Sequence, residues 1–131
     1  MRILIVWLSI VGAVLLGVVG YFTLGPGHGE RFPVWTVTDG DPRQGRRVIV
    51  MHGCHACHVI AGIREATGRV GPKLEEIDSQ IYIGGVLPNS PDNMVRWILD
   101  PRSFSPETAM PDLDVSAQDA RNIAAYLFRN P

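Results

Sequence analysis

The pattern Cys54-His55-Ala56-Cys57-His58, near the middle of a 131-residue chain, constrains the fold more than any other feature. Its two thiols and its last imidazole would face the same way within one helical turn, because positions i, i+3 and i+4 share a helix face. Two such thiols can add to the vinyl groups of a haem while the imidazole reaches the iron, which is the C-x-x-C-H attachment pattern. The motif predicts one haem c, bound covalently through Cys54 and Cys57 and ligated by His58.

Other chemistries also use two cysteines at this spacing, namely a thioredoxin-like dithiol, half of a zinc site and a structural disulfide. A dithiol of that kind would require alternating strands and helices, whereas this sequence shows helical patterns separated by loops. Zinc would require four protein ligands, but the chain has no second cysteine pair and its other histidines are only His28, His52 and His55. His52 and His55 are too close to the motif to reach the opposite face of a haem. The residues therefore favour haem attachment.

The N-terminal segment has the composition of a membrane span. Residues 3–24 carry no charge, and at ~1.5 Å per residue they could cross a hydrocarbon core of about 30 Å as a helix. The apolar run is longer than the ~7–15 residues of a typical signal peptide, and no A-x-A cleavage site follows it. We expect residues 1–24 to be an uncleaved transmembrane anchor in a bacterial inner membrane, with a cytoplasmic N-terminus and the haem domain on the periplasmic side, where haem is attached.

Residues 25–40 have the composition of a linker followed by an extended segment. Gly25, Pro26 and Gly27 break regular structure, and β-branched residues before Gly40 favour extended backbone. The aromatic residues Phe32 and Trp35 would pin this segment either to the chain's own domain or to another subunit.

The domain itself is expected to cover residues 41–131 and to be all-α. Asp41-Pro42 has the pattern of a helix start, with an N-cap acceptor followed by proline at the first helical position. Ser90-Pro91 repeats this pattern, and Ser116 with Asp119 forms a variant of the capping box. Further expected elements are a short helix over residues 74–81 and loops over residues 59–70 and 102–113.

Three residues outside the motif are candidates for contacts with the haem or its ligand. Pro72 fixes the backbone and leaves its carbonyl free to accept the second ring N–H of an iron-bound His58, although a simple turn also explains this proline. Tyr82 and Trp97 could each donate a hydrogen bond to a haem propionate, although core packing is the simplest explanation of Trp97.

The iron ligand on the face opposite His58 decides the class of chemistry, and three methionines are candidates. Met51 lies on the histidine side of the motif, and Met94 lies on a helix face where a methionine usually fills the core. Met110 lies far downstream in a loop stiffened by Pro111, so we predict that Met110 is the sixth ligand. Histidine–methionine ligation raises the potential and leaves no open iron position. One-electron transfer rather than enzymatic catalysis is the predicted function.

Together these residues resemble a class I monohaem cytochrome c over residues 41–130. The resemblance rests on the Cys54 to His58 motif and on three further groups of residues: Gly71-Pro72, Thr108-Ala109-Met110-Pro111 and Ala124-Ala125-Tyr126-Leu127. Residues 92–101 look like the cytochrome c domains fused to or associated with haem–copper oxidases. The resemblance implies an α-helical cytochrome c fold around the haem, axial ligation by His58 and Met110, a Pro72 carbonyl that accepts from His58, and Gly45 packed against Tyr126 where two helices cross.

The charge distribution limits the choice of partners. Without the anchor and its one arginine, 11 of the 12 Lys+Arg residues remain beside 13 Asp+Glu, a formal charge of −2. Such mild acidity without a basic stripe argues against nucleic-acid binding. Soluble carriers of the family often have a lysine-rich docking ring, but Lys73 is the only lysine here. This favours a membrane-anchored carrier or a subunit of a respiratory or photosynthetic complex, with a terminal oxidase or quinol-oxidising complex as redox partner. The alternatives are a haem-based ligand sensor with a labile Met110 and a thiol–disulfide protein.

Overall fold

The computed structural model describes residues 2–24 and 39–129, and the chain divides into two compact units, Met1–Glu30 and Arg31–Pro131. In the first unit, the uninterrupted helix α1 (Arg2–Leu24) exposes apolar side chains such as Leu16, which is 76% exposed. Over the part of the chain that is described, no helix has the length and apolar character needed to cross a membrane. The expected linker falls almost wholly outside the described residues, and so do Phe32 and Trp35.

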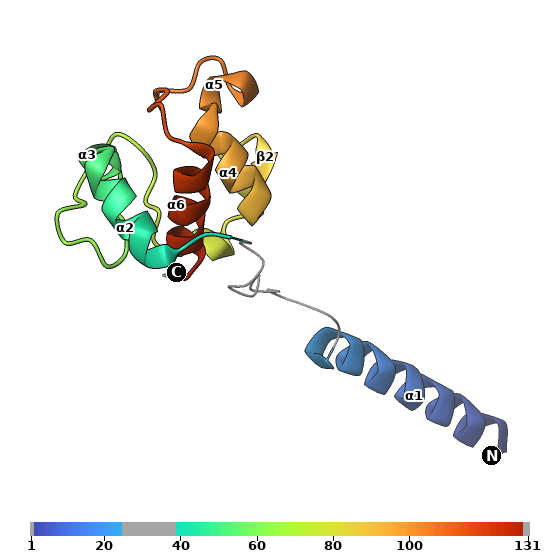
Figure 1. The fold of residues 1–131 in the computed structure, drawn as a ribbon. Helices are drawn as coiled ribbons and strands as arrows, with labels where there is room; N and C mark the ends of the chain where they lie inside the picture. Colours follow the sequence, from blue (N-terminus) through green and yellow to red (C-terminus); the bar gives the residue numbers. More distant parts are fainter. Residues whose placement is uncertain (1, 25–38, 130–131) are drawn as a thin grey trace. The chain divides into compact units, whose positions relative to one another are not determined.

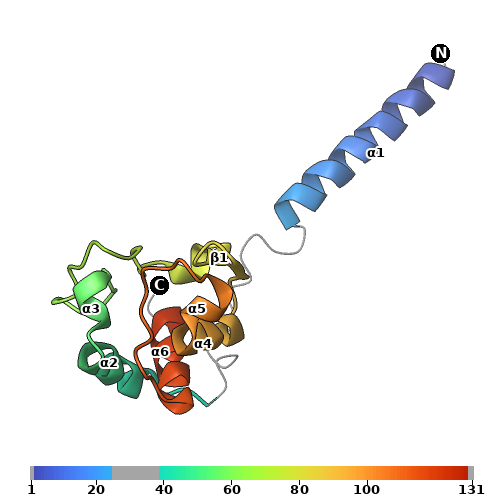
Figure 2. The same ribbon diagram turned by 90° about the horizontal axis from the view of Figure 1, so that it is seen from above.

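The second unit is mostly helical, and its last helix lies at its centre (Figure 1). This helix, α6 (Ala117–Arg129), packs against both α2 (Pro42–Met51) and α4 (Pro91–Leu99), as the view from above also shows (Figure 2). The remaining helices are the single turns α3 (Cys54–Cys57) and α5 (Pro101–Phe104). The core between the helices includes Val48, Ile49, Met94, Trp97, Ile98, Ile123, Ala124 and Leu127.

The helix starts expected from the sequence are confirmed. The Asp41 carboxylate accepts a hydrogen bond from the backbone N–H of Arg43 at 2.8 Å, and Ser90 caps α4 in the same way. Ser116 Oγ accepts from the backbone N–H of Asp119 at 3.1 Å, which is the first bond of a capping box, and it donates to the Asp119 carboxylate at 2.9 Å. These caps satisfy N–H groups that a helix leaves unpaired at its N-terminus, so each helix begins where its cap stands.

The structure corrects the all-α expectation in one place. Strands β1 (Tyr82–Ile83) and β2 (Leu87–Pro88) form a small antiparallel hairpin beside α4. Gly84 and Gly85 in its turn have φ values of 57° and 75°, which only glycine adopts readily. These two glycines reverse the chain into the hairpin.

Two further elements differ from expectation. The helix expected over residues 74–81 is only a 3₁₀ turn, η2 (Ile77–Ser79), because Glu76 before it has a left-handed φ of 58°. Pro101, two residues after the end of α4, begins α5, and the other residues of α5 lie in the segment 102–113 that was expected to be a loop. The Asp100 carboxylate accepts from the backbone N–H of Ser103 at 3.0 Å and so caps this extra turn.

The crossing of α2 and α6 depends on a glycine. A Cβ atom at Gly45 would overlap the backbone carbonyl of Asn122 and lie 2.9 Å from the Cβ of Tyr126. The close approach expected at Gly45 is therefore present. The role of Asn122 was not predicted from the sequence: this residue is buried, and its side-chain oxygen accepts from the backbone N–H of Asp41 at 2.9 Å. This bond ties the start of α2 to the middle of α6.

Candidate functional site

The motif lies on a single turn that follows a sharp change of direction after α2. Gly53, between α2 and α3, has a φ of 72°, which allows the break. The turn ends at Cys57, and His58 has an extended backbone with φ −118° and ψ 148°. The expectation that all three side chains share one helical turn thus holds only for the two cysteines. The backbone N–H of His58 still donates to the Cys54 carbonyl at 3.0 Å and keeps the imidazole next to the thiols.

Both cysteines are free and half-buried. Burial raises the pKa of the Cys54 thiol above its ordinary value; the nearby Cys57 acts in the same direction, and a backbone hydrogen bond opposes both. Cys54 also packs against the core. The two thiols are compatible with the haem c attachment motif, in which each sulfur forms one bond to the haem.

The imidazole of His58 is oriented by a backbone carbonyl. His58 Nδ1 lies 2.7 Å from the carbonyl oxygen of Pro72. A carbonyl can only accept, so Nδ1 carries the proton and donates it. The other ring nitrogen, Nε2, then holds the lone pair that a metal ion needs. The structure therefore contains the predicted Pro72 contact and leaves Nε2 of His58 able to ligate iron.

The backbone of residues 68–72 lies directly against the motif. A Cβ atom at Gly71 would overlap the His58 ring, at 2.6 Å from Nδ1 and 2.8 Å from Nε2. The backbone N–H of Gly71 donates to the Cys57 carbonyl at 2.9 Å. A Cβ at Gly68 would overlap the backbone of Ala56 and Cys57. Both glycines are needed for this segment to pack so closely on the histidine and the turn before it.

The three methionines lie in different environments. Met94 is buried in the core at 3% exposure, which confirms its assignment as core filler, and Met51 is 72% exposed at the end of α2. Met110 is half-buried against the core in the segment that joins α5 to α6. Its backbone N–H donates to the hydroxyl of Thr108 at 3.2 Å. That Met110 ligates the iron stays a prediction.

The two proposed propionate donors also differ. Trp97 is buried, and a Cβ at Gly84 would overlap its ring, at 2.6 Å from Cζ2, so the indole packs closely from α4 against the hairpin turn. Core packing thus accounts for Trp97. Tyr82 on β1 is 57% exposed. A hydrogen bond from either residue to a haem propionate stays a prediction.

His52 and His55, which the sequence excluded as ligands on the opposite face of a haem, differ in their contacts. His52 Nδ1 lies 3.3 Å from the carbonyl oxygen of Leu113, which belongs to the segment that carries Met110. His55 Nδ1 is buried and has no hydrogen-bond partner among the described residues. Sequence spacing offered no signal for the first contact, because its two partners are 61 residues apart.

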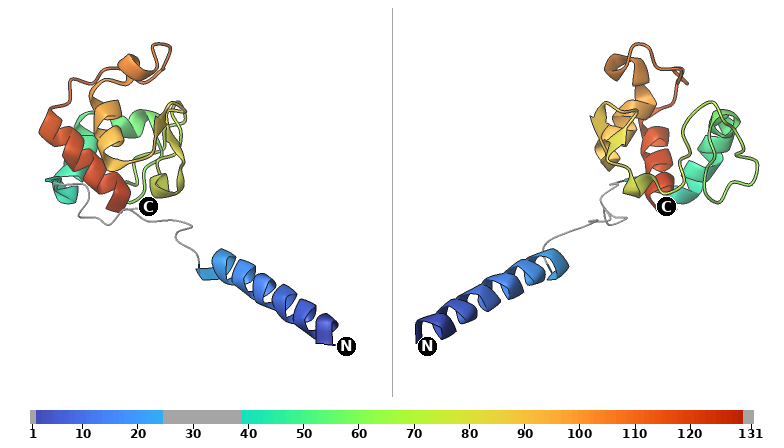
Figure 3. Two further views of the ribbon diagram at one scale, coloured as in Figure 1. Left: turned by 90° about the vertical axis from the view of Figure 1, so that its right-hand side faces the viewer. Right: turned by 180° about the vertical axis from the view of Figure 1, so that it is seen from behind.

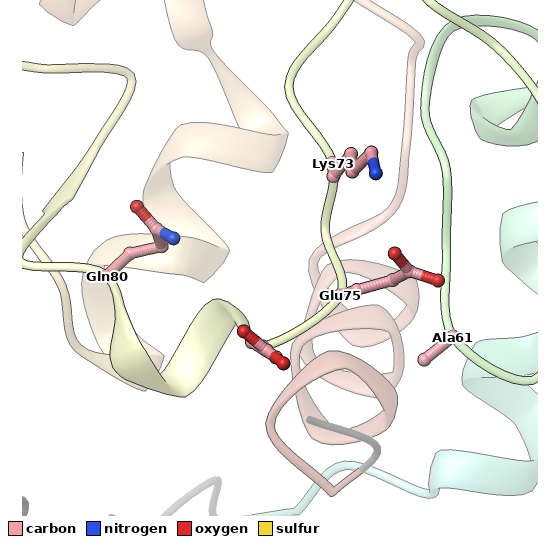
Figure 4. A pocket seen from close by; sticks show the side chains of 5 residues that line it. Ala61, Lys73, Glu75 and Gln80 are labelled. Carbon is pink, nitrogen blue, oxygen red and sulfur yellow. The ribbon is translucent and has the colours of Figure 1, made fainter.

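Two cavities of the described domain are lined by residues outside the motif. One of about 570 Å³ is lined by Ala61, Lys73, Glu75, Glu76 and Gln80 (Figure 4). A second, of about 440 Å³, is lined by Glu75 and by residues within 59–66. The described residues also contain no group of three or more His, Cys, Asp and Glu side chains that could hold a metal ion. The candidate site is therefore defined by the motif and the backbone packed on it.

These residues fit a covalently attached haem. The two free thiols are half-buried, and the imidazole that follows them is fixed in one tautomer by Pro72. His55, between the two cysteines in the sequence, adds a buried ring nitrogen that has no hydrogen-bond partner among the described residues. A polar atom buried in this way usually has a partner, so its position within the motif fits a group that is bound next to it.

Comparison with known proteins gives a match for part of the chain. No family model matches it, and no solved structure does. Part of the chain is similar to cytochrome c oxidase subunit 2. It is 34% identical over 85 residues to that protein from Alkalihalophilus pseudofirmus (strain ATCC BAA-2126 / JCM 17055 / OF4), covering 64% of this chain and 24% of the relative. Identity to subunit 2 from Bacillus sp. (strain PS3) is 30% over 76 residues, or 56% of this chain and 21% of the relative. The chain spans about a quarter or less of the length of either relative.

Proposed function

We propose that this chain binds one c-type haem through Cys54 and Cys57 and transfers single electrons in a respiratory chain. The observation that carries the proposal is the 2.7 Å hydrogen bond from His58 Nδ1 to the Pro72 carbonyl. It leaves an imidazole Nε2 able to ligate iron directly after two free thiols, which is the arrangement that covalent haem attachment requires. The partial similarity to cytochrome c oxidase subunit 2 supports the respiratory setting.

The haem would supply an iron that accepts and returns one electron. His58 would ligate one face of it and Met110 the other, which closes both axial positions to substrates and raises the potential. Pro72 holds the His58 ring by a hydrogen bond, and Gly71 allows the backbone to press against that ring. Tyr82 and Trp97 are proposed to donate to the propionates. A histidine held in this way needs little rearrangement when the iron changes its charge, which suits fast electron transfer.

Replacing Met110 tests the ligand assignment. In Met110→Ala, the oxidised protein should lose the weak sulfur-to-iron band in its near-infrared spectrum, because no thioether remains to bind the iron. Met51→Ala is the matched control, since Met51 is 72% exposed, and this variant should keep the band. A band of unchanged intensity in Met110→Ala would remove Met110 from the site.

We further propose that residues 1–24 anchor the chain in the bacterial inner membrane, with the haem domain on the periplasmic side. Residues 3–24 are uncharged and form most of the continuous helix α1. A terminal oxidase or a quinol-oxidising complex is the proposed redox partner. Because Lys73 is the only lysine available for docking, the protein would act as a tethered carrier or a fixed subunit.

Membrane fractionation tests the anchor. The full chain should stay with the membranes through salt and alkaline washing, whereas a chain in which a cleavable signal peptide replaces residues 1–24 should be soluble after export and keep its haem spectrum. Recovery of the full chain in the soluble fraction would contradict the anchor and leave the haem proposal standing. Mild solubilisation of the same membranes should release the anchored protein together with its redox partner.

A further inference from the structure

The segment between α5 and α6 packs on the core through Met110, Leu113 and Val115, and its hydrogen bonds are mostly short-range. Figure 3 shows it, in orange to red, returning from α5 to the start of α6. The backbone N–H of Thr108 donates to the Ser105 carbonyl at 3.0 Å, and that of Met110 donates to the Thr108 hydroxyl at 3.2 Å. The backbone N–H of Asp114 donates to the Asp112 carboxylate at 2.9 Å. These bonds shape the segment locally but do not attach it to the rest of the domain.

One hydrogen bond with a distant partner joins this segment to another element. Among the hydrogen bonds between described residues, only the contact of His52 Nδ1 with the Leu113 carbonyl, at 3.3 Å, links residues 105–115 to a helix outside the segment and its flanking helices. Because a carbonyl only accepts, the His52 ring must donate. Leu113 is half-buried against the core and stands three residues after Met110.

The His52 side of this hydrogen bond is held firmly. His52 is the C-cap of α2, and its backbone N–H donates to the Val48 carbonyl at 2.9 Å, so the imidazole projects from a fixed helix end. The α5–α6 segment, which carries the accepting Leu113 carbonyl, is held less firmly. Asp114, next to Leu113, has a φ of 51°, a left-handed conformation that residues other than glycine adopt at a cost in free energy. A turn of this kind persists when contacts from outside the turn hold it.

We propose that His52 is a positioning residue for Met110. Its hydrogen bond to Leu113 holds the α5–α6 segment in place and so keeps the methionine thioether over the face of the haem opposite His58. This inference rests on the proposed ligation by Met110. In this proposal His52 is neither a ligand of the iron nor a point of attachment for the haem. Its loss should therefore leave the haem attached and make the sixth ligand easier to displace.

Two substitutions of nearly equal shape isolate the hydrogen bond. In His52→Asn, the side-chain amide nitrogen can take the place of Nδ1 and donate to Leu113. In His52→Leu, a side chain of similar size has no donor, and His52→Ala is a second donor-free variant should leucine prevent folding. The measurement is the rate at which imidazole displaces the methionine from the oxidised, haem-loaded full chain, followed together with the near-infrared band.

The matched control is Tyr126→Phe. It removes another hydrogen bond between a side chain and a distant backbone carbonyl, that of Tyr126 Oη to the Ala61 carbonyl at 2.7 Å, on the loop that follows the motif. A donor-free His52 variant should bind imidazole roughly fivefold faster than the parent, which corresponds to about 1 kcal/mol. His52→Asn and Tyr126→Phe should bind it at about the parent's rate.

The remaining outcomes overturn the inference in distinguishable ways. Equal imidazole rates in the parent, the asparagine variant and the donor-free variants would show that His52 does not hold the segment. An equal acceleration in Tyr126→Phe would show a general loss of stability instead. If the parent lacks the near-infrared band, and Met110→Ala binds imidazole at the parent's rate, the ligation by Met110 fails and the role of His52 fails with it.

Discussion

The imidazole of His58 is confined on two sides by backbone. Pro72 accepts its Nδ1 proton at 2.7 Å, and a Cβ atom at Gly71 would overlap the ring. Gly71-Pro72 thus acts on the His58 ring in two ways. The Pro72 carbonyl fixes the tautomer and the direction of the ring, and the missing side chain of Gly71 lets the backbone lie against it. In the proposed haem protein both constraints act on the iron ligand.

Gly71→Ala should disturb the histidine more than any change at Pro72. The new methyl group and the His58 ring cannot occupy their present positions together, and overpacking of this kind costs about 1–3 kcal/mol. The free energy of unfolding, from a denaturant titration of the haem-loaded protein, should fall by that amount. Pro72→Ala is the control, because it keeps the accepting carbonyl and should cost less, about 0.4–1 kcal/mol. Equal stability of Gly71→Ala and the parent would contradict the contact.

Among single residues, contacts between positions close in the sequence could be predicted. The hydrogen bond from His58 to Pro72 spans 14 residues and was expected, because a proline carbonyl after glycine suits a histidine ligand. The contact of His52 with Leu113 spans 61 residues and could not be predicted, because only the folded chain brings the two together. For the same reason, it could not be predicted that His55 Nδ1 would be buried with no hydrogen-bond partner among the described residues.

Among the elements, α6 connects most of the domain. It packs on α2 and α4, and Tyr126 on α6 donates to the Ala61 carbonyl at 2.7 Å, in the loop that follows the motif. Burial is the main influence on the Tyr126 hydroxyl and raises its pKa, while Arg46 lowers it in part. The hydroxyl therefore holds its proton more tightly in the folded chain than in the unfolded chain.

The sign of this shift predicts a loss of stability in alkali. Below the ordinary tyrosine pKa of about 10 the contribution of Tyr126 is fully present, and it is lost as pH rises through the higher folded-state pKa. The urea midpoint should fall between neutral pH and pH values above about 10, and it should fall less in Tyr126→Phe. At neutral pH the variant should already be less stable by about 1 kcal/mol, since it lacks the bond to Ala61. The same alkaline decrease in both proteins would contradict this role of Tyr126.

The elements that the sequence predicted best are those with a cap. Asp41, Ser90 and Ser116 each act within three residues, so the starts of α2, α4 and α6 could be predicted from the sequence alone. The hairpin and α5 could not, because their glycine and proline signals are shared by simple loops. For Gly84, the outcome depended on its close contact with the Trp97 ring, which is a tertiary contact.

At the scale of the whole molecule, the described domain is a helical unit in which α2 and α4 flank α6, and its motif turn follows directly from α2. The similarity to cytochrome c oxidase subunit 2 covers at most 64% of this chain and 24% of a relative. This similarity supports a role in respiration and does not identify the redox partner. The proposed function therefore depends on one chemical property that is still a proposal, the covalent attachment of a haem at Cys54 and Cys57.

Acid–acetone extraction tests that attachment most directly. The full chain should be produced in a bacterial host able to attach c-type haem, next to a variant carrying both Cys54→Ser and Cys57→Ser. Acidified acetone removes haem that is bound without covalent bonds. If the haem is attached covalently as proposed, its absorption stays with the precipitated parent chain, whereas the double variant retains none. A parent chain that releases its haem into the acetone, or that acquires no haem, would contradict the account.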